Sequence, residues 1–298
     1  MTPTTTDVRF PTNGLQLAGR LHLPEHAAGP LPAVVIGHQT TGVKEQSPAV
    51  YAERLVTHGY VILTFDAAFQ GESGGEPRGL EDPFQRAEDF RAAVSYLTTR
   101  DDVDSERIGV MGICGSGAYA PYAAQTDHRM KAVAGVSGTD VPSFFREADP
   151  QGWRQLVADS GKLRTKEAAG EPAVTVDALP EQVDETTPGP IAEFVDYYKT
   201  PRGRHPRSTG KWVARSADLL DQFDSFADVA KIAPRPLLMI AGTEAATRGF
   251  SEKAVTDGGP SAELFLVEGA THVDLYDRDE YVSPAVEKLV EFFGDKLK

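Results

Sequence analysis

The chain has 298 residues, of which 40% are hydrophobic and 25% are charged, as in an ordinary folded globular protein. This length allows one large α/β domain with an insertion. The formal net charge of -14 indicates a solvated acidic surface, and it argues against nucleic acid or an anionic membrane surface as the principal partner.

Cys114 is the single cysteine of the sequence. One cysteine excludes disulfides within the chain and metal clusters held by several thiolates, and it favours a reducing compartment. Residues 1–7 lack the charged and apolar regions of a signal peptide, and no apolar run is long enough to span a bilayer. We therefore expect a cytoplasmic protein without a membrane partner.

The N-terminal region alternates apolar and polar residues over 8–10 and 15–23, around the turn dipeptide Asn13-Gly14. This alternation predicts an antiparallel hairpin at the edge of a sheet. The later apolar runs are short and nearly continuous, which is typical of parallel strands buried on both faces. These runs cover residues 33–36, 60–65, 108–113, 131–136, 236–240 and 264–267.

Helical patterns separate most of these runs. Residues 83–99 carry an apolar stripe at i, i+3, i+4 and i+7, which predicts an amphipathic helix. Ser47-Pro48 and Ser283-Pro284 each combine an N-cap residue with proline at the first helical position, and so they predict two helix starts. The alternation of strands and helices predicts a doubly wound, mostly parallel α/β sheet.

Between residues 141 and 233 the alternation stops, and the segment is rich in Pro, Gly, Asp and Thr with scattered aromatic residues. Long excursions of this kind in a compact domain are usually functional. We therefore predict a core made of residues 1–140 and 234–298, with a partly helical cap at 141–233 inserted after the sixth strand.

The segment 107–118 has the pattern of a buried strand, a glycine-rich turn and a helix, with Cys114 at the bend. Such a nucleophile elbow needs small residues two positions before and two after the nucleophile, and Gly112 and Ser116 meet this need. The N-terminus of the following helix favours a thiolate, so we expect a lowered pKa for Cys114.

Two other interpretations of this turn remain. In the first, Cys114 is a buried structural cysteine, since cysteine is among the most buried residue types. In the second, the register shifts and Ser116 is the nucleophile, flanked by Cys114 and Ala118. The apolar run that ends at Ile113 favours the turn at Cys114.

A cysteine nucleophile needs a base, and His272 follows the last predicted strand in a loop that could return to the elbow. The loop that opens with His38 could supply backbone N–H groups that join the N–H of Gly115 in an oxyanion hole. Gln39 and Thr40 are both candidates for the second donor.

Taken in order, these motifs resemble the α/β-hydrolase superfamily, and more closely its dienelactone-hydrolase-like branch, whose elbow carries cysteine. The resemblance extends over nearly the whole chain. Its motifs cover residues 42–46, 65–66, 70–75, 107–117, 234–242 and 269–276. It implies an α/β-hydrolase fold and cleavage of esters or lactones without a cofactor or a metal, and it transfers the reaction class better than the substrate.

The sequence departs from the superfamily pattern at the acid of the triad, because Ala245 stands where an aspartate often follows the seventh strand. Two carboxylates remain as candidates. Asp140 follows the sixth strand, where some members of the superfamily place the acid. Glu244 lies one residue from the usual position and has a longer reach. We favour Asp140 slightly.

Trp153, Tyr197 and Tyr198 in the predicted cap, together with His38, are the candidates for substrate contact. The basic run 202–211 stands out in an acidic chain. It is open to three interpretations, namely a solvated loop, a site for an anionic substrate group, and a contact with a partner subunit.

These features predict a cofactor-independent hydrolase of a small carboxylic ester, lactone or thioester that forms an acyl-enzyme on Cys114. An acyltransferase or cyclase with the same Cys114 and His272 is the first alternative, because a dry, apolar cap would exclude water. A non-catalytic binding protein on the hydrolase fold is the second. We expect a small molecule as the partner, with a homodimer as one option for the oligomeric state.

Overall fold

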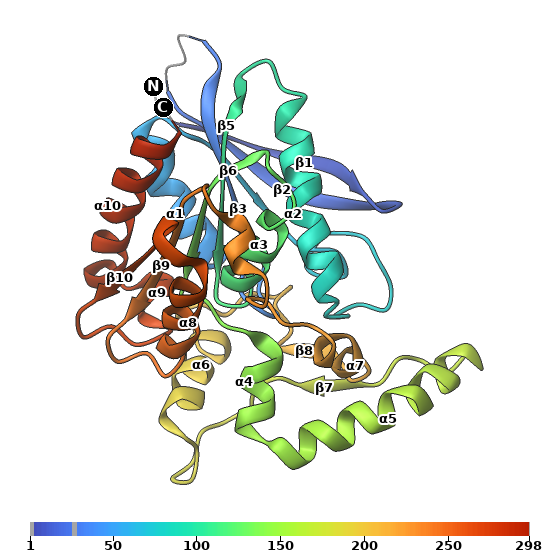
Figure 1. Ribbon diagram of the computed structural model, residues 1–298. Coiled ribbons are helices and arrows are strands. Elements are labelled where there is room, and N and C mark those ends of the chain that lie inside the picture. Colours follow the sequence, from blue (N-terminus) through green and yellow to red (C-terminus); the bar gives the residue numbers. More distant parts are fainter. Residues whose placement is uncertain (1–2, 26–28, 298) are drawn as a thin grey trace.

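The computed structural model describes residues 3–25 and 29–297, which form an eight-stranded sheet with helices on both faces (Figure 1). The strands follow the order β1-β2-β4-β3-β5-β6-β9-β10 across the sheet. Strand β2 pairs antiparallel with β1 and β4, and all the other described pairs of this sheet are parallel. The strands are β1 (Thr4–Thr12), β2 (Leu15–Leu23), β3 (Leu31–Gly37), β4 (Val61–Phe65), β5 (Val103–Ile113), β6 (Met130–Val136), β9 (Leu237–Gly242) and β10 (Ala262–Val267). The predicted doubly wound, mostly parallel α/β fold is confirmed.

The N-terminal hairpin forms where the alternating pattern predicts it. Asn13 and Gly14 have φ values of 40° and 79°, as a two-residue type I′ turn requires. Phe10 of β1 lies opposite Leu17 of β2, and both side chains are buried. The period of two along each strand therefore turns one face of the hairpin toward the core.

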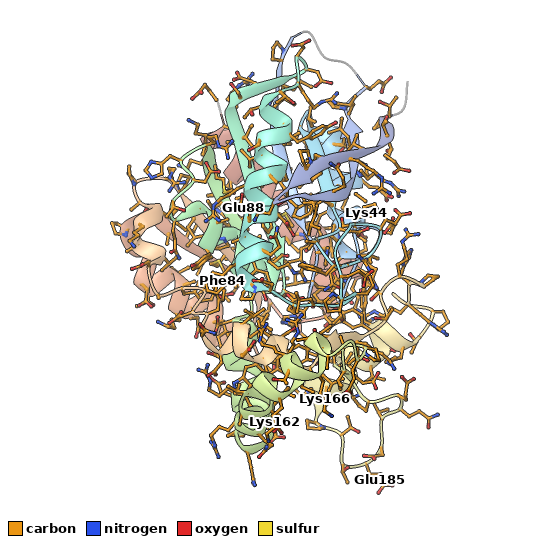
Figure 2. The ribbon with its side chains drawn as sticks, turned by 90° about the vertical axis from the view of Figure 1, so that its right-hand side faces the viewer. Lys44, Phe84, Glu88, Lys162, Lys166 and Glu185 are labelled. Carbon is orange, nitrogen blue, oxygen red and sulfur yellow. The ribbon has the colours of Figure 1, made fainter. Side chains whose placement is uncertain are left out.

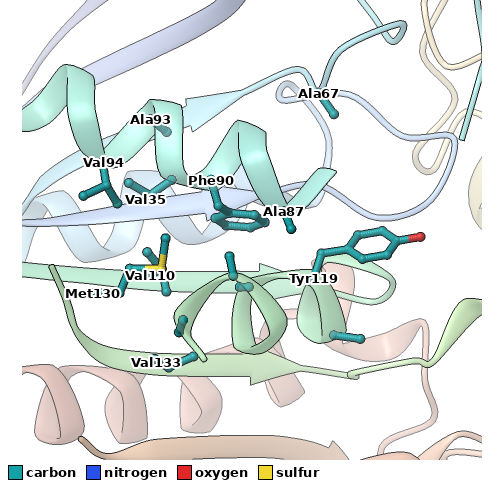
Figure 3. Close-up of a cluster of buried hydrophobic side chains, with 14 of the residues drawn as sticks. Val35, Ala67, Ala87, Phe90, Ala93, Val94, Val110, Tyr119, Met130 and Val133 are labelled. Carbon is teal, nitrogen blue, oxygen red and sulfur yellow. The ribbon is translucent and has the colours of Figure 1, made fainter. Parts of the chain in front are cut away.

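Helices cover both faces of the sheet. One face carries α2 (Pro83–Thr98), α3 (Ser116–Ala124) and α8 (Arg248–Gly258), and the other carries α1 (Ser47–Leu55) and α10 (Asp279–Lys296). The short elements η1 (Val56–His58), η3 (Gly259–Ser261) and α9 (Asp274–Asp277) complete the core. Figure 3 shows Phe90 and Val94 of α2 packed over Val35 and Val110 of the central strands. No helix in residues 3–25 and 29–297 is both long and apolar enough to cross a lipid bilayer.

Helix α10 begins earlier than the sequence predicts. It starts at Asp279, so Pro284 lies inside the helix and not at its first position. The acidic side chains of Asp279 and Glu280 occupy the first turn, where they interact favourably with the helix dipole. The proline removes one intrahelical hydrogen bond without ending the helix.

Residues 141–233 are called the insert below. Residues 141–221 of it lie together beyond the carboxyl ends of the parallel strands, at the bottom of Figure 1, whereas residues 229–232 pack against α3 and α8 of the core. In the interior of the insert, Phe145 stacks on Trp153 and Trp212. Figure 2 shows Lys162 and Lys166 on α5 of the insert, away from Lys44 in the core. The insert contains α4 (Val141–Ala148), α5 (Pro150–Ala168), β7 (Thr175–Asp177), α6 (Gly189–Lys199), β8 (Lys211–Val213), α7 (Ser216–Asp221) and η2 (Val229–Ile232).

The basic run 202–211 joins the insert to the core through ion pairs. Arg207 Nη2 lies 2.6 Å from Glu45 Oε1, and Arg202 Nη2 lies 2.7 Å from Asp277 Oδ1 in α9. Glu45 Oε1 is also 2.9 Å from Nζ of the buried Lys44. These two arginines are therefore paired with carboxylates of the core, although the side chain of Arg207 remains 38% exposed.

The turn from β5 to α3 brings Gly112 against the first residue of α3. A Cβ atom at Gly112 would lie 1.8 Å from the carbonyl oxygen of Ser116, far inside van der Waals contact. Gly161 in α5 offers the opposite situation, because a Cβ atom there would meet no atom within 4 Å outside its own helix backbone. The two glycines form a matched pair for testing the turn.

We expect Gly112→Ala to lower the free energy of unfolding by about 3 kcal/mol or more, because backbone must move to relieve the overlap. Gly161→Ala should raise that free energy by up to about 1 kcal/mol, because alanine is the better helix former. Chemical denaturation of both variants measures the two effects. A Gly112→Ala variant as stable as the parent would contradict the tight turn.

Candidate active site

The bend between β5 and α3 lies at Cys114. Its φ of 56° is in the left-handed region, and its N–H group donates to the carbonyl oxygen of Val136 at 2.9 Å. Ser116 is already the first residue of α3, and its hydroxyl group donates to the carbonyl oxygen of His38 at 2.5 Å. The side chain at the apex of the elbow is therefore the thiol of Cys114, and the hydroxyl of Ser116 is committed to a structural bond.

Backbone N–H groups from two loops converge on the sulfur atom of Cys114. The backbone of Gly115 and Thr40 and the hydroxyl groups of Thr139 and Tyr276 lie beside it, and each acts to lower the pKa of the thiol. Thr40, and not Gln39, is thus the residue that joins Gly115 at the sulfur. The Gln39 side chain instead accepts a hydrogen bond from the hydroxyl of a buried serine at the start of α1, at 2.6 Å.

His272 reaches the sulfur through Tyr276. The Nε2 atom of His272 lies 2.9 Å from the Tyr276 hydroxyl, and this hydroxyl also acts on the pKa of the Cys114 thiol. On the other side of the ring, Nδ1 lies 2.5 Å from the hydroxyl of Thr247. The described residues thus form the sequence Cys114, Tyr276, His272 and Thr247, in which each side chain contacts the next.

Sequence reasoning missed both Tyr276 and Thr247. Tyr276 follows His272 by four residues, a spacing that puts two side chains on one face of a helical turn. Residues 273–277 form such a turn around α9, so this spacing is the signal that could have identified Tyr276. For Thr247 we find no comparable signal in the sequence.

Neither predicted acid is a hydrogen-bond partner of His272 in the described structure. Asp140 caps α4 by accepting from the N–H of Ser143, and its other oxygen accepts from the Ser225 hydroxyl at 2.6 Å. Glu244 has an exposed side chain. The assignment of Asp140 or Glu244 as the orienting acid is therefore not supported by this geometry, because Thr247 occupies the ring nitrogen that an acid would bind.

Burial keeps the ionisable groups of the site neutral. It lowers the pKa of His272 to about 3 and raises the pKa of Tyr276 well above its ordinary value. Burial also raises the pKa of Cys114, although the hydrogen bonds from Tyr276, Thr40 and Gly115 act in the opposite direction. The sequence-based expectation of a lowered pKa for Cys114 is wrong in direction, because loss of hydration outweighs the helix N-terminus.

A cavity of about 240 Å³ opens above the sulfur, between the core and the insert. Its floor is formed by Cys114, Thr40 and Thr139, and its walls are mostly apolar side chains of the insert. These wall residues are Val141, Phe144, Phe145, Ala148, Ala178, Leu179, Ile191, Phe194 and Tyr198. An apolar group attached to an acyl carbon near the sulfur would be enclosed here.

Of the four candidates for substrate contact, only Tyr198 is among the cavity-lining residues of the described structure. Tyr197 packs behind it against the ring of Tyr276, with centroids 5.0 Å apart. Trp153 stacks inside the insert and donates to a carboxylate of α7 at 2.8 Å. These residues support the walls and do not form them.

His38 is buried beneath the cavity. Its Nε2 atom accepts from the N–H of Ala67 at 3.0 Å, so its Nδ1 atom carries the proton and donates to the carbonyl oxygen of Gln39 at 2.7 Å. Burial lowers the pKa of His38 well below the ordinary value. The prediction that His38 contacts substrate is therefore wrong in this structure, and the ring instead fixes the loop that presents Thr40.

The described part of the chain holds no group of three or more histidine, cysteine, aspartate or glutamate side chains arranged to bind a metal ion. The polar groups around the sulfur are backbone N–H groups and hydroxyls. Such groups stabilise a developing negative charge on oxygen by hydrogen bonding. The arrangement is suited to covalent attack by the thiol on an acyl carbon.

Comparison with known proteins identifies the family to which this chain belongs. Residues 17–152 match the sequence profile of the Dienelactone hydrolase family. The uncharacterized protein PA2218 of Pseudomonas aeruginosa is 36% identical over 296 residues, which cover 95% of this chain and 78% of that protein. The chain belongs to the dienelactone hydrolase family. The crystal structure of PA2218 matches this hydrolase with a TM-score of 0.91 over 99% of this chain and 94% of that chain.

Two further relatives of this hydrolase carry names that describe an activity. Thiohydrolase aneE of Aspergillus aculeatus is 36% identical over 169 residues, which cover 56% of this chain and 52% of that protein. Acyltransferase drtE of Aspergillus calidoustus is 28% identical over 305 residues, which cover 96% of this chain and 94% of that protein. Relatives of this hydrolase are thus named for hydrolysis and for acyl transfer.

We expect iodoacetamide to alkylate Cys114 more slowly at pH 7 than it alkylates a small-molecule thiol, because the raised pKa leaves less thiolate. The rate should rise about tenfold per pH unit until the pH passes the ordinary thiol range. Mass spectrometry of the single labelled cysteine gives the rate, with the denatured protein as the control. A plateau below pH 8 would show a thiolate stabilised by the site and would contradict this expectation.

Proposed function

We propose that this hydrolase cleaves a small carboxylic ester, lactone or thioester through an acyl-enzyme on Cys114, without a cofactor. The observation that carries the proposal is the position of the Cys114 thiol at the apex of the elbow and at the floor of an apolar cavity, with the backbone of Gly115 and Thr40 beside the sulfur. Donors aimed at the reacting atom act as an oxyanion hole once an acyl carbon is bound there. Membership of a hydrolase family supports the same reaction class.

In the proposed reaction, His272 is the base that receives the proton of the Cys114 thiol. The sulfur attacks the acyl carbon, and the N–H groups of Gly115 and Thr40 hold the oxyanion. Collapse of the intermediate expels the alcohol or thiol, which takes the proton back from His272. Water then attacks the acyl-thioester, with His272 again as the base, and Cys114 is released.

Thr247 takes the place that a carboxylate has in the catalytic triad. In the proposed tautomer, Nδ1–H of His272 donates to the Thr247 hydroxyl, and the unprotonated Nε2 lies against the Tyr276 hydroxyl. A neutral hydroxyl orients the ring but stabilises an imidazolium less than a carboxylate would. A thiol tolerates this loss better than a serine hydroxyl, because it ionises far more easily.

Among the three substrate classes we favour the thioester. Acyl transfer from a thioester to Cys114 exchanges one carbon–sulfur bond for another, whereas transfer from an oxygen ester to a thiol is uphill. Burial lowers the pKa of His272 to about 3, so the imidazolium that would protonate an alcohol leaving group is costly to form. The relative named as a thiohydrolase is consistent with this choice.

Acyl transfer to a second substrate is the alternative function. The walls contributed by Val141, Phe144, Ile191 and Phe194 are apolar, so the cavity holds little that would orient a water molecule for hydrolysis. The relative named as an acyltransferase matches nearly the whole chain. Analysis of the product distinguishes the two, since hydrolysis releases the free acid and transfer releases a new ester, lactone or amide.

We expect Cys114→Ala to lower turnover of acyl-thioesters by about 10⁴-fold or more and to abolish any acyl adduct, because the nucleophile is lost. Ser116→Ala is the matched control and should retain most of the activity, since Ser116 is bonded within the turn. Intact-mass analysis after incubation with acyl-thioesters and the corresponding oxygen esters measures both effects. A Cys114→Ala variant with normal turnover would refute the proposed nucleophile.

The cavity walls should set the length of the acyl group. Phe144→Ala enlarges the cavity, so we expect a shift of preference toward longer acyl chains, by about fourfold in kcat/KM per added methylene that becomes buried. Phe84→Ala, at an exposed aromatic residue of α2, is the control and should leave the chain-length profile unchanged. Kinetics with a series of straight-chain acyl-thioesters give the profile. An identical profile for Phe144→Ala would show that the acyl group lies elsewhere.

A further inference from the structure

We propose that Tyr276 is a catalytic residue whose hydroxyl group carries the proton from the thiol of Cys114 to His272. This inference rests on the acyl-enzyme function proposed above, and it adds the path by which the nucleophile and the base exchange a proton. Three features of the site support it, namely the position of the hydroxyl, the orientation of the imidazole and the packing that fixes the phenol ring.

The Tyr276 hydroxyl occupies the position between the sulfur and the imidazole. Its oxygen lies 2.9 Å from Nε2 of His272, and the same hydroxyl interacts with the neighbouring thiol of Cys114. When its one O–H proton is donated to Nε2, its oxygen is free to accept the S–H proton. A base removes a proton only from an atom within hydrogen-bond reach, or through one bridging group. In this site the bridging group is the side chain of Tyr276.

The orientation of His272 leaves the bridged path as the one that the structure offers. Nδ1 contacts the Thr247 hydroxyl and Nε2 contacts the Tyr276 hydroxyl. In the tautomer with the proton on Nδ1, Thr247 accepts that proton's hydrogen bond and Nε2 is the nitrogen that accepts a proton. The carbonyl group of His272 accepts from the Ser137 hydroxyl at 3.0 Å, which anchors the backbone of this loop. With the ring held from both sides, its accepting nitrogen faces Tyr276.

The phenol ring of Tyr276 is held firmly in place. It is fully buried in α9, and the ring of Tyr197 packs against it edge to face with centroids 5.0 Å apart. The hydroxyl of Tyr51 donates to the carbonyl oxygen of Leu275 at 2.7 Å, which ties α9 to α1. The Tyr198 hydroxyl, which donates to the carbonyl oxygen of Thr40 at 3.1 Å, also acts on Tyr276 electrostatically. These contacts hold the ring of Tyr276 in place.

The proton path balances at each step. As the sulfur of Cys114 attacks the acyl carbon, the S–H proton moves to the Tyr276 oxygen and the O–H proton moves to Nε2 of His272. The carbon–sulfur bond forms, and the carbonyl electron pair moves to the oxygen. When the intermediate collapses, the leaving group takes a proton from Tyr276, which recovers one from His272. Tyr276 is a neutral phenol before and after each step.

The first test is Tyr276→Phe, which removes the bridging oxygen and keeps the ring. We expect kcat to fall by about 10²- to 10⁴-fold with KM nearly unchanged, because the proton transfer is impaired and substrate binding is not. Tyr60→Phe removes a hydroxyl from a buried ring that packs on Phe293 of α10, outside the site, and should keep kcat near that of the parent. A Tyr276→Phe variant with normal kcat would overturn the relay.

A double variant separates a relay from an independent structural role. If Tyr276 and His272 act in one path, adding Tyr276→Phe to His272→Ala should cause little further loss of kcat. Losses that multiply would overturn the proposal. Thermal denaturation of each variant shows whether the fold is retained.

The parent protein provides a test that needs no variant. Single-turnover acylation in mixtures of H₂O and D₂O should give a curved dependence of the rate on the deuterium fraction, because two protons move in the same step. A linear dependence would indicate a single moving proton and would overturn the relay.

The experiments distinguish failure of the acyl-enzyme proposal from failure of the relay. An active Cys114→Ala variant refutes the acyl-enzyme, whereas an inactive Cys114→Ala variant with a fully active Tyr276→Phe variant refutes only the relay.

Discussion

The left-handed backbone at Cys114 is the constraint on which the rest of the site depends. With a φ of 56° at this residue, the chain leaves β5 and enters α3 within two residues. The bend is possible because the backbone approaches itself at positions without side chains, and a Cβ atom at Gly117 would lie 2.8 Å from the Cα atom of Gly138. The same bend lifts the thiol beyond the sheet and puts it beside the backbone of Gly115 and Thr40. Backbone geometry, and not charge, builds the site.

The chemistry of the site follows from burial without charge. Cys114, Tyr276 and His272 are all buried and neutral, and their partners are hydroxyl and N–H groups. Burying a carboxylate beside them would carry a large desolvation cost unless a cation accompanied it. A thiol nucleophile makes the carboxylate dispensable, because less basicity is needed to ionise it. In the proposed reaction, the cysteine nucleophile is therefore what allows a neutral threonine to take the place of a carboxylate beside the histidine.

Local patterns predicted the frame of the molecule, because the hairpin, the buried strands and the elbow are each determined within a few residues. The partners of His272 could not be predicted in this way, since Tyr276 and Thr247 look like packing residues until the fold brings them together. Asp140 was predicted to contact His272, but the sequence contained a signal against this role. Asp140 followed by Val-Pro is an N-cap pattern, and its carboxylate caps α4. The pKa of Cys114 was misjudged because a helix N-terminus is visible in sequence, whereas burial is a property of the whole fold.

The ion pair between Arg202 and Asp277 has a consequence for how such proteins diversify. Arg202 belongs to the insert, while Asp277 ends the short helix that carries Tyr276. In the proposed reaction, the insert would therefore buttress the reacting groups as well as enclose the acyl chain. Exchanging this segment between relatives, in evolution or in the laboratory, would alter specificity and turnover together unless the arginine and its carboxylate are exchanged as a pair.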